Sequence, residues 1–134
     1  MSYRNFTSHV QTMLRDTVKL DMLIPTNGAT TPVASGIRGI PGAVVTRTGV
    51  GTYTIALPAG FNFPARPVIV AQLQLSAIGA TRAQILGYNT TTRTLTVQCV
   101  TAALNVAVEW PAANADNNLM VSFTFSNSSA LPVR

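Results

Sequence analysis

Few side chains in this sequence can transfer a proton, attack an electrophile or bind a metal ion. The acidic residues, the one histidine and the one cysteine are the candidates: Asp16, Asp21, Glu109, Asp116, His9 and Cys99. His9 is the side chain whose ordinary pKa suits a general base near neutral pH. It lies with Asp16 and Asp21 in the first 25 residues, a segment that offers little pre-organisation for catalysis.

The spacing of these residues matches no familiar catalytic or metal-binding motif. The Gly-x-Ser-x-Gly turn of a nucleophilic serine is missing, one cysteine and one histidine do not make a zinc site, and residues 116–118 do not have the spacing of a calcium loop. Glu109 and Asp116 could form the carboxylate pair of a glycoside hydrolase, with Trp110 as a sugar platform, but one is expected at a strand end and the other in a loop. We therefore expect no enzyme activity, no metal and no cofactor.

From residue 43 onward the sequence predicts short strands separated by turns. Alternating apolar and polar residues indicate seven of them, over residues 43–48, 51–57, 67–75, 81–88, 94–100, 104–110 and 119–125. Many short strands without a helical period are typical of an antiparallel β-sandwich or jelly roll. The fold prediction is thus all-β, with about seven or eight strands.

Several local features refine this prediction. Gly49-Val50-Gly51 predicts a tight turn with a positive φ, and residues 89–93 predict a hairpin turn. Val68 and Val70 give the strand over 67–75 a second apolar face, so we expect its first half to be covered on both sides. Cys99 and Trp110 are expected in the core. The loop over residues 58–64 carries two aromatic side chains that belong either to the core or to an interface, Phe61 and Phe63.

Residues 1–42 differ from the body over residues 43–134 and predict an arm followed by a turn-rich linker. Apolar residues recur at helical spacing over about 6–16, whereas residues 18–24 alternate as a strand does, and the two interpretations compete. An arm of this kind cannot bury its own apolar side chains, so we expect it to lie along a neighbouring subunit. The candidate partner-binding residues are Phe6, Val10, Met13, Leu14, Leu20 and Met22.

The chain is unusually poor in charge. Charged residues make up 10% of it, against about 25% in a typical soluble domain. Its net charge of +5 comes from arginines spread along the chain rather than from a basic cluster, so we expect no nucleic-acid partner. No signal peptide and no apolar run of about 18 residues is present, so we expect synthesis in the host cytoplasm and no membrane insertion. An uncharged surface predicts a protein that is covered by partners in an assembly.

The segment from Arg47 to Pro58, which reads RTGVGTYTIALP, resembles a segment common in small virion proteins of tailed bacteriophages. Residues 89–100 and 119–127 are similar in style, and together the resemblance covers residues 43–127. The size of the chain resembles that of the capsid decoration, or cement, proteins. This resemblance implies a protein on the outside of an icosahedral capsid that binds the major capsid protein, pairs with itself as a homodimer or trimer on local symmetry axes, and stabilises the shell.

Two other classes of function compete with this one. A receptor- or glycan-binding domain of a phage tail or fibre would bind sugar through Trp110 or Tyr88 in a shallow pocket. A small wall hydrolase would need Glu109 and Asp116. No feature of the sequence favours the hydrolase.

Overall fold

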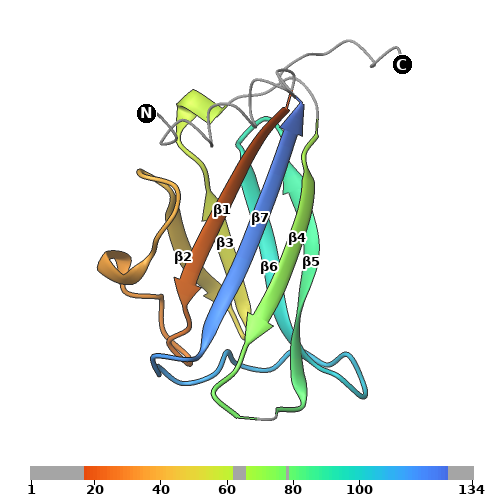
Figure 1. Ribbon diagram of the computed structural model, residues 1–134. Coiled ribbons are helices and arrows are strands. Elements are labelled where there is room, and N and C mark those ends of the chain that lie inside the picture. Colours follow the sequence, from red (N-terminus) through yellow and green to blue (C-terminus); the bar gives the residue numbers. More distant parts are fainter. Residues whose placement is uncertain (1–16, 62–65, 78, 127–134) are drawn as a thin grey trace, which may run out of the picture.

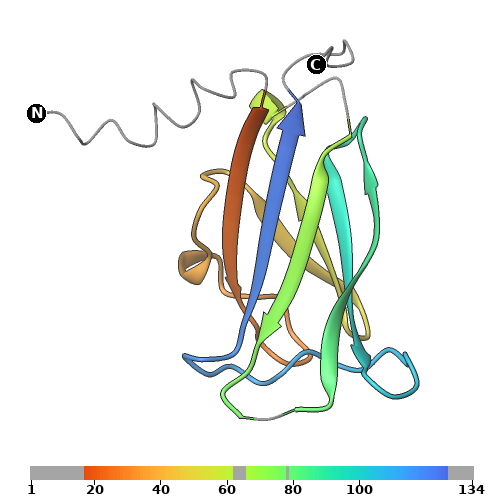
Figure 2. The same cartoon turned by 45° about the vertical axis from the view of Figure 1, so that its right-hand side comes forward.

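Two antiparallel sheets pack face to face in the computed structural model, which describes residues 17–61, 66–77 and 79–126 (Figures 1 and 2). Within these ranges the strands are β1 (Thr17–Pro25), β2 (Val44–Gly49), β3 (Thr52–Ala56), β4 (Val68–Gln74), β5 (Thr81–Asn89), β6 (Thr94–Thr101) and β7 (Asn118–Ser126). The three-stranded sheet has the order β1-β7-β4, and the four-stranded sheet has the order β2-β3-β6-β5. Two short 3-10 helices, η2 (Ala34–Gly36) and η3 (Ala59–Phe61), lie in the connections. The predicted all-β sandwich is confirmed.

Side chains that point inward from both sheets form a single hydrophobic core. Phe123 and Phe125 of β7 stack with their ring centroids 5.9 Å apart, and Tyr88 of β5 meets both rings edge-on. Leu95 and Val97 of β6 are completely buried opposite them. Alternation with a period of two therefore places one face of every strand in the core.

β1 is a full member of this sandwich, although its residues lie in the segment predicted to be an arm. It pairs with β7 over its whole length, from Thr17 opposite Ser126 to Pro25 opposite Asn118. Ile24 is completely buried. Of the two competing interpretations, the strand over 18–24 is present as part of β1, and the sandwich begins at β1 rather than at residue 43. The predicted helix over 6–16 lies outside the described residues.

The strand predicted over residues 104–110 was wrong. This segment makes only one isolated bridge, between Ala107 and Val100, and Leu104 is 77% exposed. The reason is tertiary: β6, the strand that precedes it, already pairs with β3 on one side as far as Gln98 and with β5 on the other, so only the last residues of β6 are left for this segment. The chain turns at Asn105, whose φ of 55° is left-handed, and returns along the end of β6.

The expectation that the first half of β4 is covered on both faces was also wrong. Val68 and Val70 are 68% and 59% exposed. Ile69, Ala71 and Leu73, which alternate with them, pack against the core. β4 is an edge strand, and nothing in the described part of the chain covers its outer face.

The two predicted turns are confirmed. Gly51, between β2 and β3, has a φ of 61°. Between β5 and β6, the Asn89 side-chain oxygen accepts hydrogen bonds from the backbone N–H groups of Thr91 and Thr92. Arg93 completes that turn with a φ of 56°. Gly51 and Asn89 are residue types that tight turns favour, whereas Arg93 occupies a left-handed position that glycine or asparagine usually takes.

Candidate functional site

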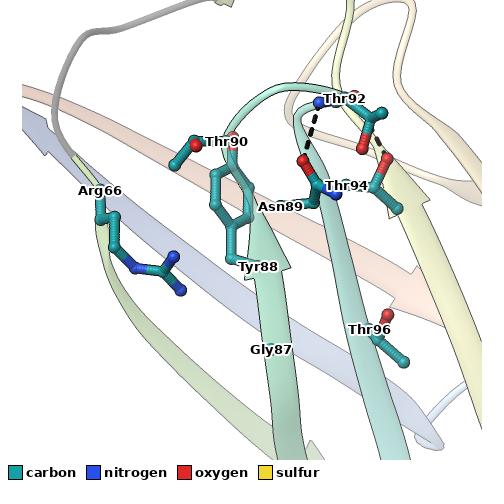
Figure 3. Close-up of a pocket in the computed structure, with 8 residues that line it drawn as sticks. All are labelled: Arg66, Gly87, Tyr88, Asn89, Thr90, Thr92, Thr94 and Thr96. Atoms are coloured by element: carbon teal, nitrogen blue, oxygen red, sulfur yellow. Dashed lines mark hydrogen bonds between the residues drawn. The ribbon is translucent and has the colours of Figure 1, made fainter.

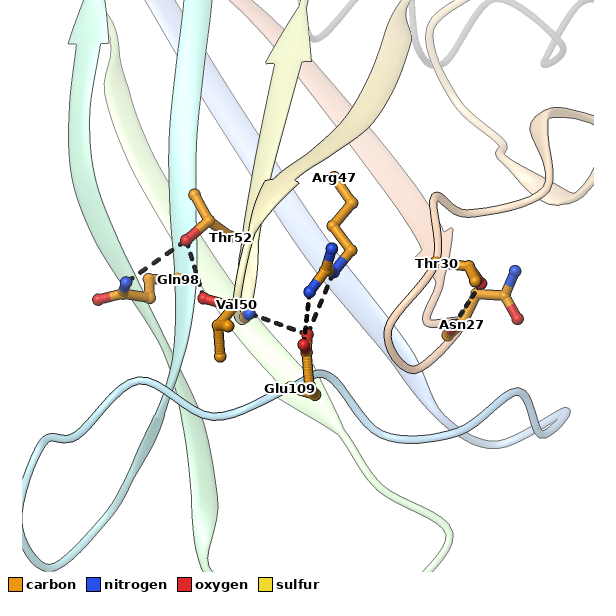
Figure 4. A network of polar contacts seen from close by, with 8 residues as sticks. Asn27, Thr30, Arg47, Val50, Thr52, Gln98 and Glu109 are labelled. Carbon is orange, nitrogen blue, oxygen red and sulfur yellow. Dashed lines mark hydrogen bonds and ion pairs between the residues drawn. The ribbon is translucent and has the colours of Figure 1, made fainter.

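The acidic residue with the most contacts, Glu109, forms an ion pair with Arg47 of β2 (Figure 4). The Arg47 guanidinium donates through Nε to Glu109 Oε1 at 3.2 Å and through Nη2 to Oε2 at 2.5 Å. The Gly51 backbone N–H donates to Oε1 at 3.1 Å. The Arg47 hydrogen bond, together with that from Gly51, lowers the pKa of Glu109 below its ordinary value.

This arrangement gives Glu109 a structural role. A carboxylate whose ionised form is favoured by a guanidinium and a backbone N–H is a poor proton donor or acceptor at neutral pH. Its contacts instead tie the segment after β6 to the turn between β2 and β3. Asp116, its suggested catalytic companion, is exposed in the loop before β7.

Trp110, which the sequence placed in the core, is indeed buried, with 2% of its surface exposed. Its ring stacks on that of Tyr53, with centroids 4.4 Å apart and planes 14° apart. The Tyr53 hydroxyl accepts a hydrogen bond from the Asn27 backbone N–H at 3.2 Å. Because both faces of this stack lie in the core, Trp110 cannot serve as an exposed sugar platform.

Among the residues that the structure describes, the remaining titratable groups do not gather into a site. Asp21 lies on the outer face of β1, 3.9 Å from the Lys19 ammonium, and accepts a hydrogen bond from the Ser122 hydroxyl at 2.6 Å. Cys99 is completely buried, as predicted, and burial raises the pKa of its thiol. In the described ranges no three His, Cys, Asp or Glu side chains come together as metal ligands. His9 and Asp16 lie outside those ranges.

A polar hollow of about 670 Å³ lies where β5 meets β6 (Figure 3). Gly87 forms its floor, and a Cβ atom built on this glycine would meet no atom within 4 Å. A side chain at position 87 would therefore project into open space. Hydroxyl and amide groups surround it, and its described lining residues are Arg66, Gly87, Tyr88, Asn89, Thr90, Thr92, Thr94 and Thr96.

The chemistry of this hollow suits a hydroxylated, neutral or acidic ligand. Arg66 is the one charged side chain among the described lining residues, and in Figure 3 its guanidinium points toward Tyr88. Threonine hydroxyls both donate and accept hydrogen bonds, as sugar hydroxyls do. Part of this capacity is already used, since Thr94 donates to the Thr92 carbonyl and Asn89 caps the turn. Sequence reasoning had named Tyr88 and a shallow pocket but not Arg66 or Gly87.

A second depression, an apolar groove of about 420 Å³, lies on the outer face of the three-stranded sheet. Leu23, Met120 and Val70 line it from the three strands of that sheet. Arg38 and Gly39 form one wall, because Leu23 and Arg38 exchange backbone hydrogen bonds of 3.0 Å. Its lining is mainly aliphatic, which favours an apolar contact over a charged ligand.

Large aliphatic side chains lie exposed at the edges and at one end of the sandwich. The exposed residues on β4 are Val68 and Val70, and those on β5 are Ile85 and Leu86. A third group, which we call the loop-end patch, consists of Val50, Leu104 and Val106. Isolated exposed aliphatic residues are common in soluble proteins, but grouped ones mark contact surfaces.

The backbone of Cys99 brings the parts of the loop-end patch to the same end of the molecule. Cys99 donates its N–H to the Gly51 carbonyl at 2.7 Å and accepts from the Val108 N–H at 3.0 Å. A strand residue directs its N–H and C=O to the same side. Residues 106–108 therefore lie beside the end of β6, on the same side as β3 and just beyond Gly51. This places them next to the turn that carries Val50.

Of the candidate partner-binding and interface residues, some lie in or against the core and the others lie outside the described residues. Met22 is 3% exposed and belongs to the core, and Leu20 packs against that core from β1. Both side chains therefore contribute to packing within the sandwich. Phe61, in η3, is partly buried against the core, and Phe63 lies outside the described residues. Four further candidates also lie outside them: Phe6, Val10, Met13 and Leu14.

Compared with known proteins, the chain matches no family model, no curated protein and no solved structure. The described residues contain no helix of the length and hydrophobicity needed to span a bilayer. The geometry of the sandwich therefore carries the functional argument.

Proposed function

We propose that this chain is a structural protein of a bacteriophage virion, which decorates the outside of the capsid by binding major capsid subunits and stabilising the shell. One observation carries the proposal: grouped aliphatic side chains lie exposed on two edge strands and at one end of a sandwich with few charges. Exposing such apolar surface to water is unfavourable in free energy, and contact with neighbouring subunits would bury it.

The charge distribution supports the same proposal. The outer face of the four-stranded sheet shows threonine in cross-strand rows, with Thr46 opposite Thr54 and Thr54 opposite Thr96. Threonine hydroxyls hydrogen-bond to water, so they make the face of a sheet polar without adding charge. A partner can bury such a face without the cost of several kcal/mol that each unpaired buried charge would bring. Contacts that are weak singly hold firmly when many copies bind one shell.

The loop-end patch is the surface we propose for the capsid. Leu104 is 77% exposed at the tip of the turn after β6, so its side chain adds little to the stability of the isolated sandwich. Leu104→Asp should leave the fold intact and weaken binding to the capsid at least about tenfold, because a carboxylate would be buried in the contact.

The test uses capsids from a phage strain in which the gene for this chain is deleted. Purified chain should co-sediment with these capsids and raise the temperature at which they release DNA. Leu104→Asp should co-sediment weakly, whereas Val33→Asp, which adds the same charge at a valine 60% exposed outside the patch, should bind as the wild type does. Failure of the wild-type chain to co-sediment at micromolar concentration would overturn the proposal.

The polar hollow above Gly87 favours one alternative, a tail or fibre domain that binds glycans. That function predicts binding of host surface polysaccharide by the isolated chain. Gly87→Val would place a branched side chain in the hollow, where a Cβ atom meets nothing within 4 Å, and should disrupt such binding. Polysaccharide binding that Gly87→Val removes, together with no affinity for capsids, would favour the alternative.

A further inference from the structure

Natural sandwiches protect their edge strands from pairing with other chains, and three of the four edge strands in the described part of this chain show such protection. On β1, the pair Lys19 and Asp21 places charge on the strand, and the backbone of Arg38 bridges to Leu23. Charged side chains and covering loops are two of the usual devices. β1 therefore has no long free edge.

The two edges of the four-stranded sheet are protected differently. β2 is irregular between Arg47 and Gly49, and the Arg47 backbone N–H donates to the Thr31 hydroxyl at 3.2 Å. β5 is irregular between Ile85 and Gly87, and it carries the charge of Arg82. A bulge twists an edge strand and interrupts its row of backbone donors and acceptors.

β4 has none of these devices within the described residues. Its sequence, VIVAQLQ, contains no charge, proline or glycine. It pairs with β7 in regular register from Val68 opposite Thr124 to Gln74 opposite Asn118, and none of the described strands pairs with its other side. A regular, uncharged segment of six or seven residues with high β-propensity at an open edge is the type that pairs with another chain. Figure 2 shows β4 as the outer strand of its sheet.

We propose that the free edge of β4 pairs antiparallel with the same edge of a second copy of this chain, so that two three-stranded sheets join into one sheet of six strands. Such a contact is isologous and closes as a two-fold dimer. Backbone hydrogen bonds supply the pairing, as in other cases of strand addition. The exposed valines of both copies would then lie on one face of the joined sheet.

The distribution of charge indicates that the partner of the β4 edge is a second copy of this chain. Each copy carries a net charge of +5, so two copies repel unless they meet where neither has charge. β4 is the one edge strand without a charged residue. Val68 and Val70 also gain by self-contact, since β-branched side chains pack well across neighbouring strands.

The inference can be tested without a capsid. Sedimentation of the full chain from about 1 to 500 μM should show a monomer–dimer equilibrium. Val70→Lys places two like charges near the two-fold axis and should raise the dissociation constant at least about tenfold. Gln72→Lys, at an already polar and exposed position, should do the same. Thr46→Lys, which adds the same charge on the exposed face of edge strand β2, should leave the constant unchanged.

Hydrogen exchange identifies the strand involved. On dilution below the dissociation constant, amides in a peptide covering residues 68–74 should exchange faster, while those of β6, which lies inside the other sheet, should not change. A chain that stays monomeric at 500 μM would overturn the inference, as would equal weakening by the lysines on β4 and on β2. A dimer that does not bind capsids would leave this inference standing and remove only the proposed function.

Discussion

The close approach of two backbones at Gly51 gives the sharpest prediction about stability. A Cβ atom at this position would lie 1.9 Å from the Val108 carbonyl oxygen, and the φ of 61° is left-handed. Gly87 offers the matched control, because a Cβ there meets nothing within 4 Å and its φ is not positive. The two substitutions Gly51→Ala and Gly87→Ala add the same atom in opposite surroundings.

The expected cost of Gly51→Ala is about 3–4 kcal/mol. The left-handed conformation costs a residue with a side chain roughly 1–2 kcal/mol. Relief of the clash requires the Val108 carbonyl to move by at least about 1 Å, since real Cβ contacts stay beyond 3.0 Å. That movement strains the hydrogen bond from Val108 to Cys99 and the one from Gly51 to Glu109, each worth about 1 kcal/mol. Such a loss is a large part of a typical stability of 5–15 kcal/mol.

Urea unfolding followed by tryptophan fluorescence measures this cost. Trp110 is the only tryptophan, and it reports on the core because it stacks on Tyr53. Linear extrapolation should give a free energy of unfolding lower by about 3–4 kcal/mol for Gly51→Ala and within about 0.5 kcal/mol of wild type for Gly87→Ala. A cost below 1 kcal/mol for Gly51→Ala, with an unchanged denaturant slope, would refute the placement of residues 106–108 against the β2–β3 turn.

Three further predictions concern the core and the ion pair. Phe123→Ala should lower the free energy of unfolding by about 3–5 kcal/mol in urea titrations, because Phe123 is completely buried between both sheets; a cost under 1 kcal/mol would contradict its central place. The pKa of Glu109 is lower in the folded chain than its ordinary value of 4.5, so its pairing stabilises fully above that pH and is lost as the pH falls through the folded pKa. Stability should therefore fall more steeply on acidification in wild type than in Glu109→Gln, and parallel pH profiles would count against the pair. Cys99 should react with a thiol reagent at about pH 8 only after unfolding, because burial raises its pKa and blocks access; rapid reaction of the native chain would show that the core is open.

The sequence by itself determined the fold class and most of the strands. Alternation such as Leu119, Val121 and Phe123 against Met120 and Ser122 places one face in the core whatever the strand order, because successive side chains point to opposite faces. Local chemistry likewise determined the turns at Gly51 and at Asn89, since a left-handed φ and a side chain that caps its own turn are properties of the residues themselves.

Alternation alone did not show which segments find a partner strand. Residues 104–110 alternate as well as β7 does, yet they form no strand, because β3 and β5 already pair with most of β6 and only its end beyond Gln98 is left to them. Residues 18–24 could equally have left the body as an arm, and only their pairing with β7 makes them part of it.

Only the tertiary structure decided which apolar residues face water. Val68 and Val70 look like core in the sequence, and their exposure follows from the position of β4 at an open edge of its sheet. In the same way, Glu109 meets Arg47 across 62 positions of sequence, and Gly87, Tyr88 and Thr96 line one hollow only because β5 and β6 pair. These contacts and exposures depend on strand order and sheet packing. Both are set by residues far apart in the sequence, so no local sequence pattern predicts them.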